Sequence, residues 1–179
     1  KVMKNDAKIR MNICEENMYM ENIDVIDNRQ KYFNYKTQMV RLKKAISSEY
    51  YLEALFIEYA IIEDRTEAIL RYEGNSIKCK EGGFVSLDKK LNKISAIARE
   101  KKSLPNRYFD EEFIEEIRLW KTARNGMIHA LMKKTVSTQE ILEIVIHGEN
   151  IVKKINRLSG NYKRAVERLM SNCSGGRYV

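Results

Sequence analysis

Apolar residues recur every three or four positions along most of the chain, which is the spacing of one face of an α-helix. Polar residues fill the intervening positions. The pattern predicts helices over residues 35–46, 49–72, 86–101, 110–134 and 137–158, with a short sixth helix reaching about residue 170. We therefore expect an all-α fold, a single helical bundle of five to six helices.

Capping residues stand where most of these helices are expected to begin. The expected caps are Ser47 or Ser48, Ser86, Asp110, and the Ser137–Glu140 capping box. Helix ends are expected at Gly74 and at Ser159–Gly160.

Residues 1–34 show no sustained period and are expected to form an N-terminal arm or a loosely packed segment. Residues 35–170 form the predicted bundle, and residues 171–179 are expected to be a flexible C-terminal tail. We place no functional site in the arm.

Composition supports this helical prediction and excludes several classes of protein. A chain of 179 residues with 8 Gly and a single Pro has few turn residues for a β-sandwich or barrel. With 44% hydrophobic and 32% charged residues, it is neither a disordered chain nor a membrane protein. The widely spaced Cys14, Cys79 and Cys173 form no CxxC pair, so we expect no zinc site and a reducing, cytoplasmic environment. Nucleotide-binding loops and metalloprotease motifs are absent from the sequence, and no cofactor is expected.

The net charge of +8 permits an anionic partner, and the charge is concentrated in segments. Residues 29–44 carry six basic and no acidic residues, whereas residues 45–76 carry two basic and seven acidic ones. Residues 89–109 and residues 151–179 each have seven basic residues and one acidic residue. Such alternation is typical of helix faces that pair with one another, and the alternative is a basic surface that follows a phosphate backbone.

One helix has a charge where its core face should be apolar. The predicted helix 110–134 carries an apolar stripe made of Phe113, Ile117, Trp120, Met127, Ile128 and Leu131. Arg124 falls near the centre of that stripe, so it must face a water-filled cleft, meet a carboxylate, or lie at an interface with another chain. Asn125 and His129 flank the stripe beside it. The plainer interpretation is an arginine whose charged end reaches solvent, next to a surface histidine.

The long helix over residues 49–72 repeats this anomaly. Glu58 and Arg65 project from a stripe that includes Leu55, Ile62 and Ile69. Glu58 is a natural counter-ion for Arg124 or for Arg65, either as a purely structural bridge or as a supporting group in a site.

The segment Arg124-Asn125-Gly126-Met127-Ile128-His129 resembles the R-x4-6-H motif of the HEPN superfamily, in the form with a polar residue directly after the arginine. The motif lies on the helix before the last long one, as it does in that family. Residues 52–70 are similar to the long early helix of such domains, and the resemblance covers roughly residues 35–158.

The resemblance implies a metal-independent endoribonuclease. The 2′-hydroxyl of RNA would attack its own phosphodiester and give a 2′,3′-cyclic phosphate and a 5′-hydroxyl. His129 would act as general acid or base, and Arg124 would stabilise the phosphate charge. Asn125 would orient His129 or the phosphate, and Glu58 and Arg65 would support the site. Lys121, Lys133 and Lys134, near the motif, are expected to contact RNA.

The resemblance also implies a homodimer in which two motifs form one composite site. Family members of this size are often toxins or abortive-infection effectors, held inactive by a nucleotidyltransferase-type antitoxin. Because the family includes noncatalytic members, the alternative is a dimeric module that binds a nucleotide or a protein. A DNA-binding protein is less consistent with the sequence, which shows no clear recognition helix.

Overall fold

A computed structural model describes residues 28–74, 85–100 and 104–174. These residues form five α-helices and one short 3-10 helix, with no β-strand among them, which confirms the predicted all-α fold. The elements are α2 (Asn28–Ser47), α3 (Tyr51–Tyr72), α4 (Leu87–Ala98), η2 (Pro105–Arg107), α5 (Glu111–Ala130) and α6 (Thr138–Ser174).

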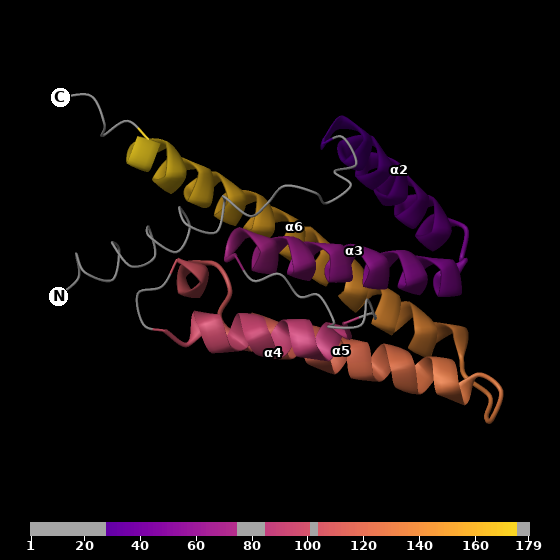
Figure 1. Cartoon of the computed structure of the whole chain (residues 1–179). Coiled ribbons are helices and arrows are strands. Elements are labelled where there is room, and N and C mark those ends of the chain that lie inside the picture. Colours follow the sequence, from indigo (N-terminus) through magenta and orange to yellow (C-terminus); the bar gives the residue numbers. More distant parts are fainter. Residues whose placement is uncertain (1–27, 75–84, 101–103, 175–179) are drawn as a thin grey trace, which may run out of the picture.

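The helices α3 and α6 run along one another through the middle of the bundle, with α2 on one side of them and α4 and α5 on the other (Figure 1). The helix α2 is antiparallel to α3. Lys31 near the start of α2 pairs with Asp64 late in α3 at 2.8 Å, and Arg41 near the end of α2 pairs with Glu53 early in α3 at 2.9 Å.

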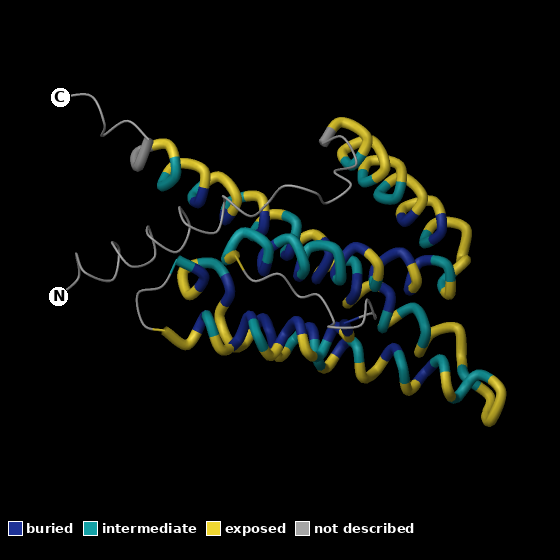
Figure 2. Tube along the Cα trace, viewed as in Figure 1, coloured by how far each residue is buried: buried dark blue, intermediate teal, exposed yellow. Residues whose placement is uncertain are grey.

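The core is built from the apolar faces of all five helices, which turn inward as Figure 2 shows. Among its largest fully buried side chains are Leu42, Leu55, Ile62, Leu91, Phe113 and Trp120. Tyr162 of α6 meets three aromatic rings edge to face, with centroid distances of 6.4 Å to Tyr72, 5.8 Å to Tyr108 and 5.6 Å to Phe109. This arrangement is favoured by the ring quadrupoles, and it ties α6 to α3 and to the segment before α5.

The first described helix begins earlier than the sequence predicted. The expected start was residue 35, whereas α2 begins at Asn28. Lys31 forms an ion pair with Asp64 of α3. This contact holds the first turns of α2 against the bundle, although the apolar pattern of the sequence is weak there. Residues 1–27 of the expected arm lie outside the described residues.

The predicted break at Ser159–Gly160 is wrong, because α6 continues unbroken to Ser174. Buried positions at Ile155, Ser159, Tyr162 and Val166 keep a spacing of three and four residues through the glycine. A glycine in a helix costs about 1 kcal/mol relative to alanine. Burial of Tyr162 and Val166 outweighs that cost. Residues 171–174 of the expected flexible tail are wrongly predicted, since they belong to the last turn of α6. Residues 175–179 lie outside the described part of the chain.

Two predicted caps are confirmed. The Asp110 carboxylate accepts a hydrogen bond from Phe113 N at 2.7 Å at the start of α5. At the start of α6, Ser137 Oγ accepts from Glu140 N at 3.2 Å, and Glu140 Oε2 accepts from Ser137 N at 2.8 Å. This reciprocal pair is a capping box.

The cap expected from Ser47 or Ser48 is wrong. The chain makes a turn with Glu49 in the left-handed region at φ 62°, and the N-cap position of α3 falls on Tyr50, which forms no side-chain cap bond. Ser86 does occupy the N-cap of α4, but its hydroxyl makes no cap bond. The predicted stop of α3 is confirmed at Gly74, which has φ 68°.

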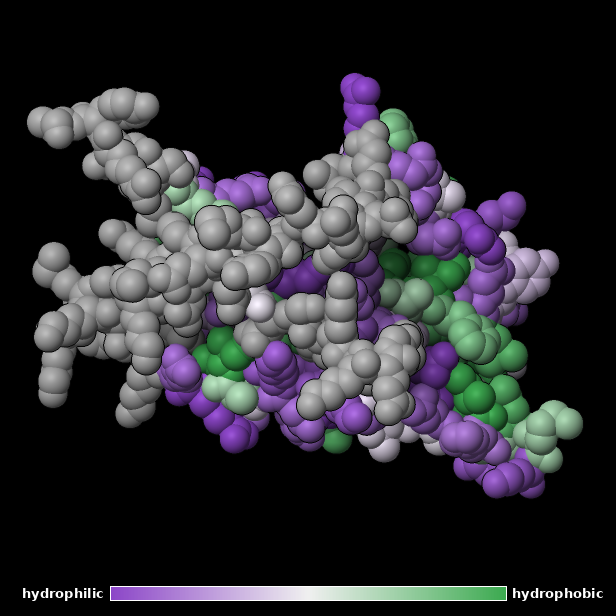
Figure 3. Space-filling view, viewed as in Figure 1, coloured by the Kyte–Doolittle hydropathy of each residue, from purple (hydrophilic) through white to green (hydrophobic). Residues whose placement is uncertain are grey.

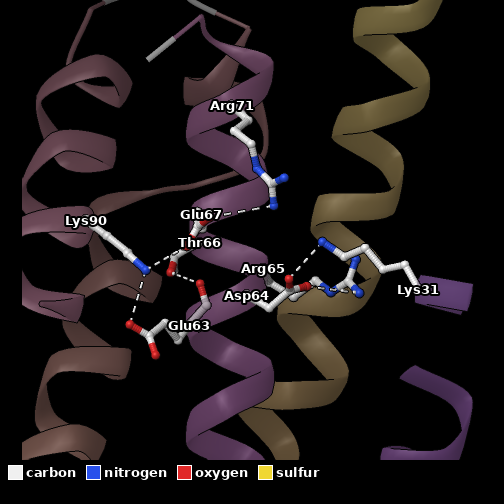
Figure 4. A network of polar contacts seen from close by, with 8 residues as sticks. All are labelled: Lys31, Glu63, Asp64, Arg65, Thr66, Glu67, Arg71 and Lys90. Carbon is white, nitrogen blue, oxygen red and sulfur yellow. Dashed lines mark hydrogen bonds and ion pairs between the residues drawn. The ribbon is translucent and has the colours of Figure 1, made fainter. Parts of the chain in front are cut away.

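Ion pairs between helices account for much of the charge alternation. The acidic helix α3 lies between the basic helices α2 and α4. Lys90 of α4 is buried and its Nζ lies 3.1 Å from Glu63 Oε1 and 2.9 Å from Glu67 Oε2 (Figure 4). On the other flank of α3, Asp64 contacts Lys31 and Arg65. Many of these charges therefore form ion pairs between neighbouring helices.

Candidate functional site

The helix α5 carries Arg124 into the interior. Its buried positions Phe113, Ile117, Trp120, Arg124 and Met127 alternate in steps of four and three, so Arg124 points the same way as the core residues before it. Trp120 Nε1 donates to the Ile144 carbonyl at 3.0 Å, which holds this face of α5 against α6. Only 8% of Arg124 is exposed.

The Arg124 guanidinium lies over two aromatic rings of α3. Its central carbon is 4.6 Å from the Tyr59 ring centroid and 5.3 Å from that of Phe56. Arg124 Nη1 donates to Asn125 Oδ1 at 2.9 Å, while Nε is buried and has no hydrogen-bond partner in the part of the chain that the structure describes. Burial lowers the pKa of Arg124 from its ordinary value, and Tyr59 and Glu58 act in the opposite direction. The guanidinium still carries its charge at neutral pH, because arginine does not lose its proton in proteins.

Glu58 is fully buried beside this arginine. Among the described residues, neither of its carboxyl oxygens has a hydrogen-bond partner, and the carboxyl group lies against the backbone of Gly148 in α6. Burial raises the pKa of Glu58 to about 9, with a further rise from the negative charge of Glu149 and an opposing effect of Arg124. Glu58 is therefore a neutral acid at neutral pH, and it does not cancel the charge of Arg124.

The expected ion pairs of Glu58 are wrong. Within the described residues, no Arg124 or Arg65 nitrogen lies within 4.0 Å of a Glu58 oxygen. Arg65 follows Glu58 by seven residues in α3, which is about 10 Å along the helix axis. It stacks over the Tyr35 ring at 4.1 Å and contacts Asp64 at 3.4 Å. Arg65 thus lies at the contact between α2 and α3, beside Asp64 and Lys31 (Figure 4).

His129 is exposed and stands apart from Arg124. Five residues of α-helix separate their directions by about 140° around the axis. No hydrogen bond joins His129 to Arg124 or Asn125 in the described part of the chain, and Asn125 instead holds the arginine. A single chain therefore presents the imidazole and the guanidinium on different sides of α5.

The three candidate RNA-binding lysines differ in their surroundings. Lys121 pairs with Asp88 of α4, which explains why it is only partly exposed. Lys133 and Lys134 lie in the turn after α5, past the end of the helix at Ala130, and both are exposed. Of these three lysines, Lys133 and Lys134 form no ion pair within the described residues, whereas Lys121 does.

Sequence analysis missed the aromatic and apolar surroundings of Arg124. Leu52, Phe56 and Tyr59 recur at helical spacing along one side of α3, and Leu52 and Phe56 are 43% and 61% exposed. Apolar residues gather on the surface at this end of the bundle, where α3 begins and α5 turns into α6 (Figure 3). The spacing of these three residues is visible in the sequence, but that α5 brings an arginine to them is not.

Comparison with known proteins gives no match: no protein-family model, no curated protein and no solved structure matches the chain. Among the described residues, no three or more His, Cys, Asp or Glu side chains are grouped so that they could hold a metal ion. None of the helices in these residues is both long and apolar enough to cross a membrane.

Proposed function

We propose that this chain is a metal-independent endoribonuclease of the HEPN toxin or defence type, active as a homodimer in the cytoplasm. One observation carries the proposal. Arg124 is a buried cation in an apolar stripe, and in the described residues no carboxylate lies within ion-pair distance of it. A buried cation without a carboxylate partner favours an anionic ligand, and the phosphodiester of RNA is such a ligand.

The neutral state of Glu58 supports a role of Arg124 in phosphate binding. A charged carboxylate beside the guanidinium would compete with phosphate for it. Because burial raises the pKa of Glu58 to about 9, no such competition exists at neutral pH. Asn125 accepts from one end of the guanidinium and fixes its orientation. The planar donor group would then stabilise charge on a phosphate oxygen as the 2′-hydroxyl attacks.

His129 would move the protons of this reaction. An exposed imidazole can take the proton from the 2′-hydroxyl or give one to the departing 5′ oxygen. The products would be a 2′,3′-cyclic phosphate and a 5′-hydroxyl. Because the substrate provides its own nucleophile, the protein needs to supply only acid-base groups and charge stabilisation.

A second copy of the chain is part of this proposal. In one chain His129 and Arg124 point to different sides of α5, so one motif alone is an incomplete site. Leu52 and Phe56 leave an apolar surface beside Arg124 that a partner subunit would cover. Two motifs facing one another there would bring the guanidinium of one subunit near the imidazole of the other. A nucleotidyltransferase-type antitoxin is the proposed inhibitor of this dimer.

The alternative function is a noncatalytic dimeric module that binds a nucleotide or a protein. The position of His129, exposed and without a hydrogen bond to Arg124 within the described residues, favours this module over an active enzyme. Such a module would bind the anion through Arg124 and leave it unchanged.

RNA cleavage in EDTA separates the two functions. We expect the wild-type protein to cut single-stranded RNA, and the Arg124→Ala and His129→Ala variants to lose this activity. His147→Ala is the matched control, because His147 is the other histidine of the chain and lies on α6 beside Glu116. Cleavage that stops in EDTA would contradict a metal-independent reaction, and cleavage equal in all four proteins would assign it to a contaminant.

A further inference from the structure

The outward face of α2 combines cations with exposed aromatic rings. At 100° per residue, seven residues besides Ser47 fall within about 60° of one line along this helix. We call them the outer α2 stripe: Arg29, Tyr32, Phe33, Lys36, Val40, Lys43 and Lys44. Tyr32, Phe33 and Val40 are 64%, 57% and 61% exposed, and α2 contains no acidic residue.

Three lysines of this stripe form no ion pair within the described residues. The two cations of α2 that lie off the stripe, Lys31 and Arg41, pair with α3 at 2.8 Å and 2.9 Å. In contrast, Lys36, Lys43 and Lys44 have no carboxylate within 4.0 Å among the described residues. Lys31 and Arg41 hold α2 to the bundle. Lys36, Lys43 and Lys44 form a positive surface that no carboxylate of the described residues neutralises.

The aromatic rings decide which polyanion fits. Tyr32 and Phe33 stand next to each other at a centroid distance of 5.9 Å and an interplanar angle of 68°. Single-stranded nucleic acids bind where cations track the phosphates and rings stack on unpaired bases. A duplex offers no free base faces on which such rings could stack. A helix that lies on a membrane has a broader apolar face than this stripe, in which three of the seven residues are apolar.

The stripe also leads toward Arg124. Because α2 is antiparallel to α3, Lys43 and Lys44 lie at the end of α2 from which the chain turns into α3. Phe56, in the second turn of α3, contacts Arg124 at 5.3 Å. The helices α2 and α5 lie on opposite sides of α3 (Figure 1), so a strand that passes around this turn would run from the stripe toward the arginine.

We propose that the outer α2 stripe is a binding surface for single-stranded RNA, separate from the reacting groups, which holds the strand as it passes around the α2–α3 turn. Lys36, Lys43 and Lys44 would contact phosphates, and Tyr32 and Phe33 would stack on bases. The inference rests on the proposed function only for the choice of RNA over another single-stranded polyanion.

Binding of a fluorescently labelled single-stranded RNA tests it, by anisotropy, in the Arg124→Ala protein so that no substrate is cut. Two independent variants alter the stripe: the triple change Lys36→Gln, Lys43→Gln and Lys44→Gln, and the double change Tyr32→Ala and Phe33→Ala. We expect the triple change to lower the slope of log affinity against log salt by about 2, at about 0.7 per lost phosphate contact. The double change is expected to weaken binding about ten-fold or more.

The matched control removes the same charge elsewhere: Lys89→Gln, Arg107→Gln and Arg168→Gln, all exposed cations. We expect it to weaken binding several-fold less than the stripe triple. Equal losses from both triples, or no effect of the aromatic double change in a protein that still melts cooperatively, would overturn the proposal. The proposal would also be overturned if the stripe variants lost binding to phosphatidylserine vesicles and kept their binding to RNA.

This outcome is independent of catalysis. RNA bound through the stripe by a wild-type protein that cuts nothing would support the surface and refute the proposed ribonuclease. If both stripe variants still cut RNA and bind it with unchanged affinity, the ribonuclease would be supported and the binding surface refuted.

Discussion

Glu58 of α3 lies against the backbone of Gly148 in α6, so closely that a methyl group on Gly148 would overlap the Glu58 carboxyl group. The same methyl group would come within 2.7 Å of Trp120 Nε1. The absence of a side chain at Gly148 thus leaves room for the buried Glu58 carboxyl group between α3 and α6, beside Arg124.

Gly148→Ala is expected to destabilise the protein. Its Cβ would displace Glu58 or Trp120, both fully buried, and overpacking of this kind costs about 1–3 kcal/mol. Urea denaturation measures the loss. Gly160→Ala on the same helix is the control, because nothing lies within 4 Å of its added Cβ. That variant is expected to gain up to about 1 kcal/mol, since alanine favours the helix. Similar effects of the two changes would contradict the close contact.

Glu58→Gln is expected to remove a dependence of stability on pH. The pKa of Glu58 is about 9 in the folded protein and near 4.5 when the chain is unfolded. Between these values the folded state holds a proton that the unfolded state has released. The free energy of unfolding therefore falls as pH rises, by up to about 1.4 kcal/mol per pH unit. Urea denaturation between about pH 5 and about pH 8 should show wild type losing stability relative to the variant. Parallel curves would contradict the raised pKa.

Arg124→Met is expected to separate stability from activity. Methionine fills a similar volume in the apolar stripe without a buried charge, so the free energy of unfolding should stay level or rise by about 1–3 kcal/mol. RNA cleavage should disappear. Arg118→Met on the same helix is the control, since within the described residues the ion pair of Arg118 is a single one, with Glu115 at 3.6 Å. Its stability should change by less than about 0.5 kcal/mol, and cleavage should persist. A large loss of stability in Arg124→Met would instead indicate a structural role for the arginine.

Lys90→Ala is expected to weaken the contact between α3 and α4. Lys90 is 3% exposed and bridges Glu63 and Glu67, which would be left as neighbouring negative charges. The expected loss is about 1–3 kcal/mol, reduced from that of a fully buried pair because Glu67 is half exposed. The adjacent Lys89 is exposed, so Lys89→Ala should change thermal stability little. A melting temperature equal in both variants would show that the buried cluster contributes nothing.

The fold could be predicted from sequence where side-chain spacing alone decides the structure. The stripes of Leu55 to Ile69 and of Phe113 to Met127 gave the helices and their inward faces. The break at Gly160 was mispredicted because the intrinsic cost of a glycine is local, whereas the burial of Tyr162 and Val166 that overrides it is tertiary.

The candidate site could be predicted only in part, for a related reason. A helical wheel gives the direction of a side chain, and it correctly put Arg124 and Glu58 on buried faces. It does not give the distance between residues on different helices. The expected ion pair of these two residues fails because the Glu58 carboxyl group lies against Gly148, and the Arg124 guanidinium lies over Phe56 and Tyr59.

The central claim is that Arg124 and His129 of two subunits cut RNA together. The most direct measurement is cleavage of single-stranded RNA in EDTA by a co-expressed pair of Arg124→Ala and His129→Ala chains, purified as a heterodimer. Each variant alone should be inactive, and the heterodimer should regain activity with 2′,3′-cyclic phosphate products, because it retains one intact arginine and one intact histidine on opposite subunits. A heterodimer as inactive as either variant, beside an active wild type, would contradict the composite site, and an inactive wild type would contradict the enzyme itself.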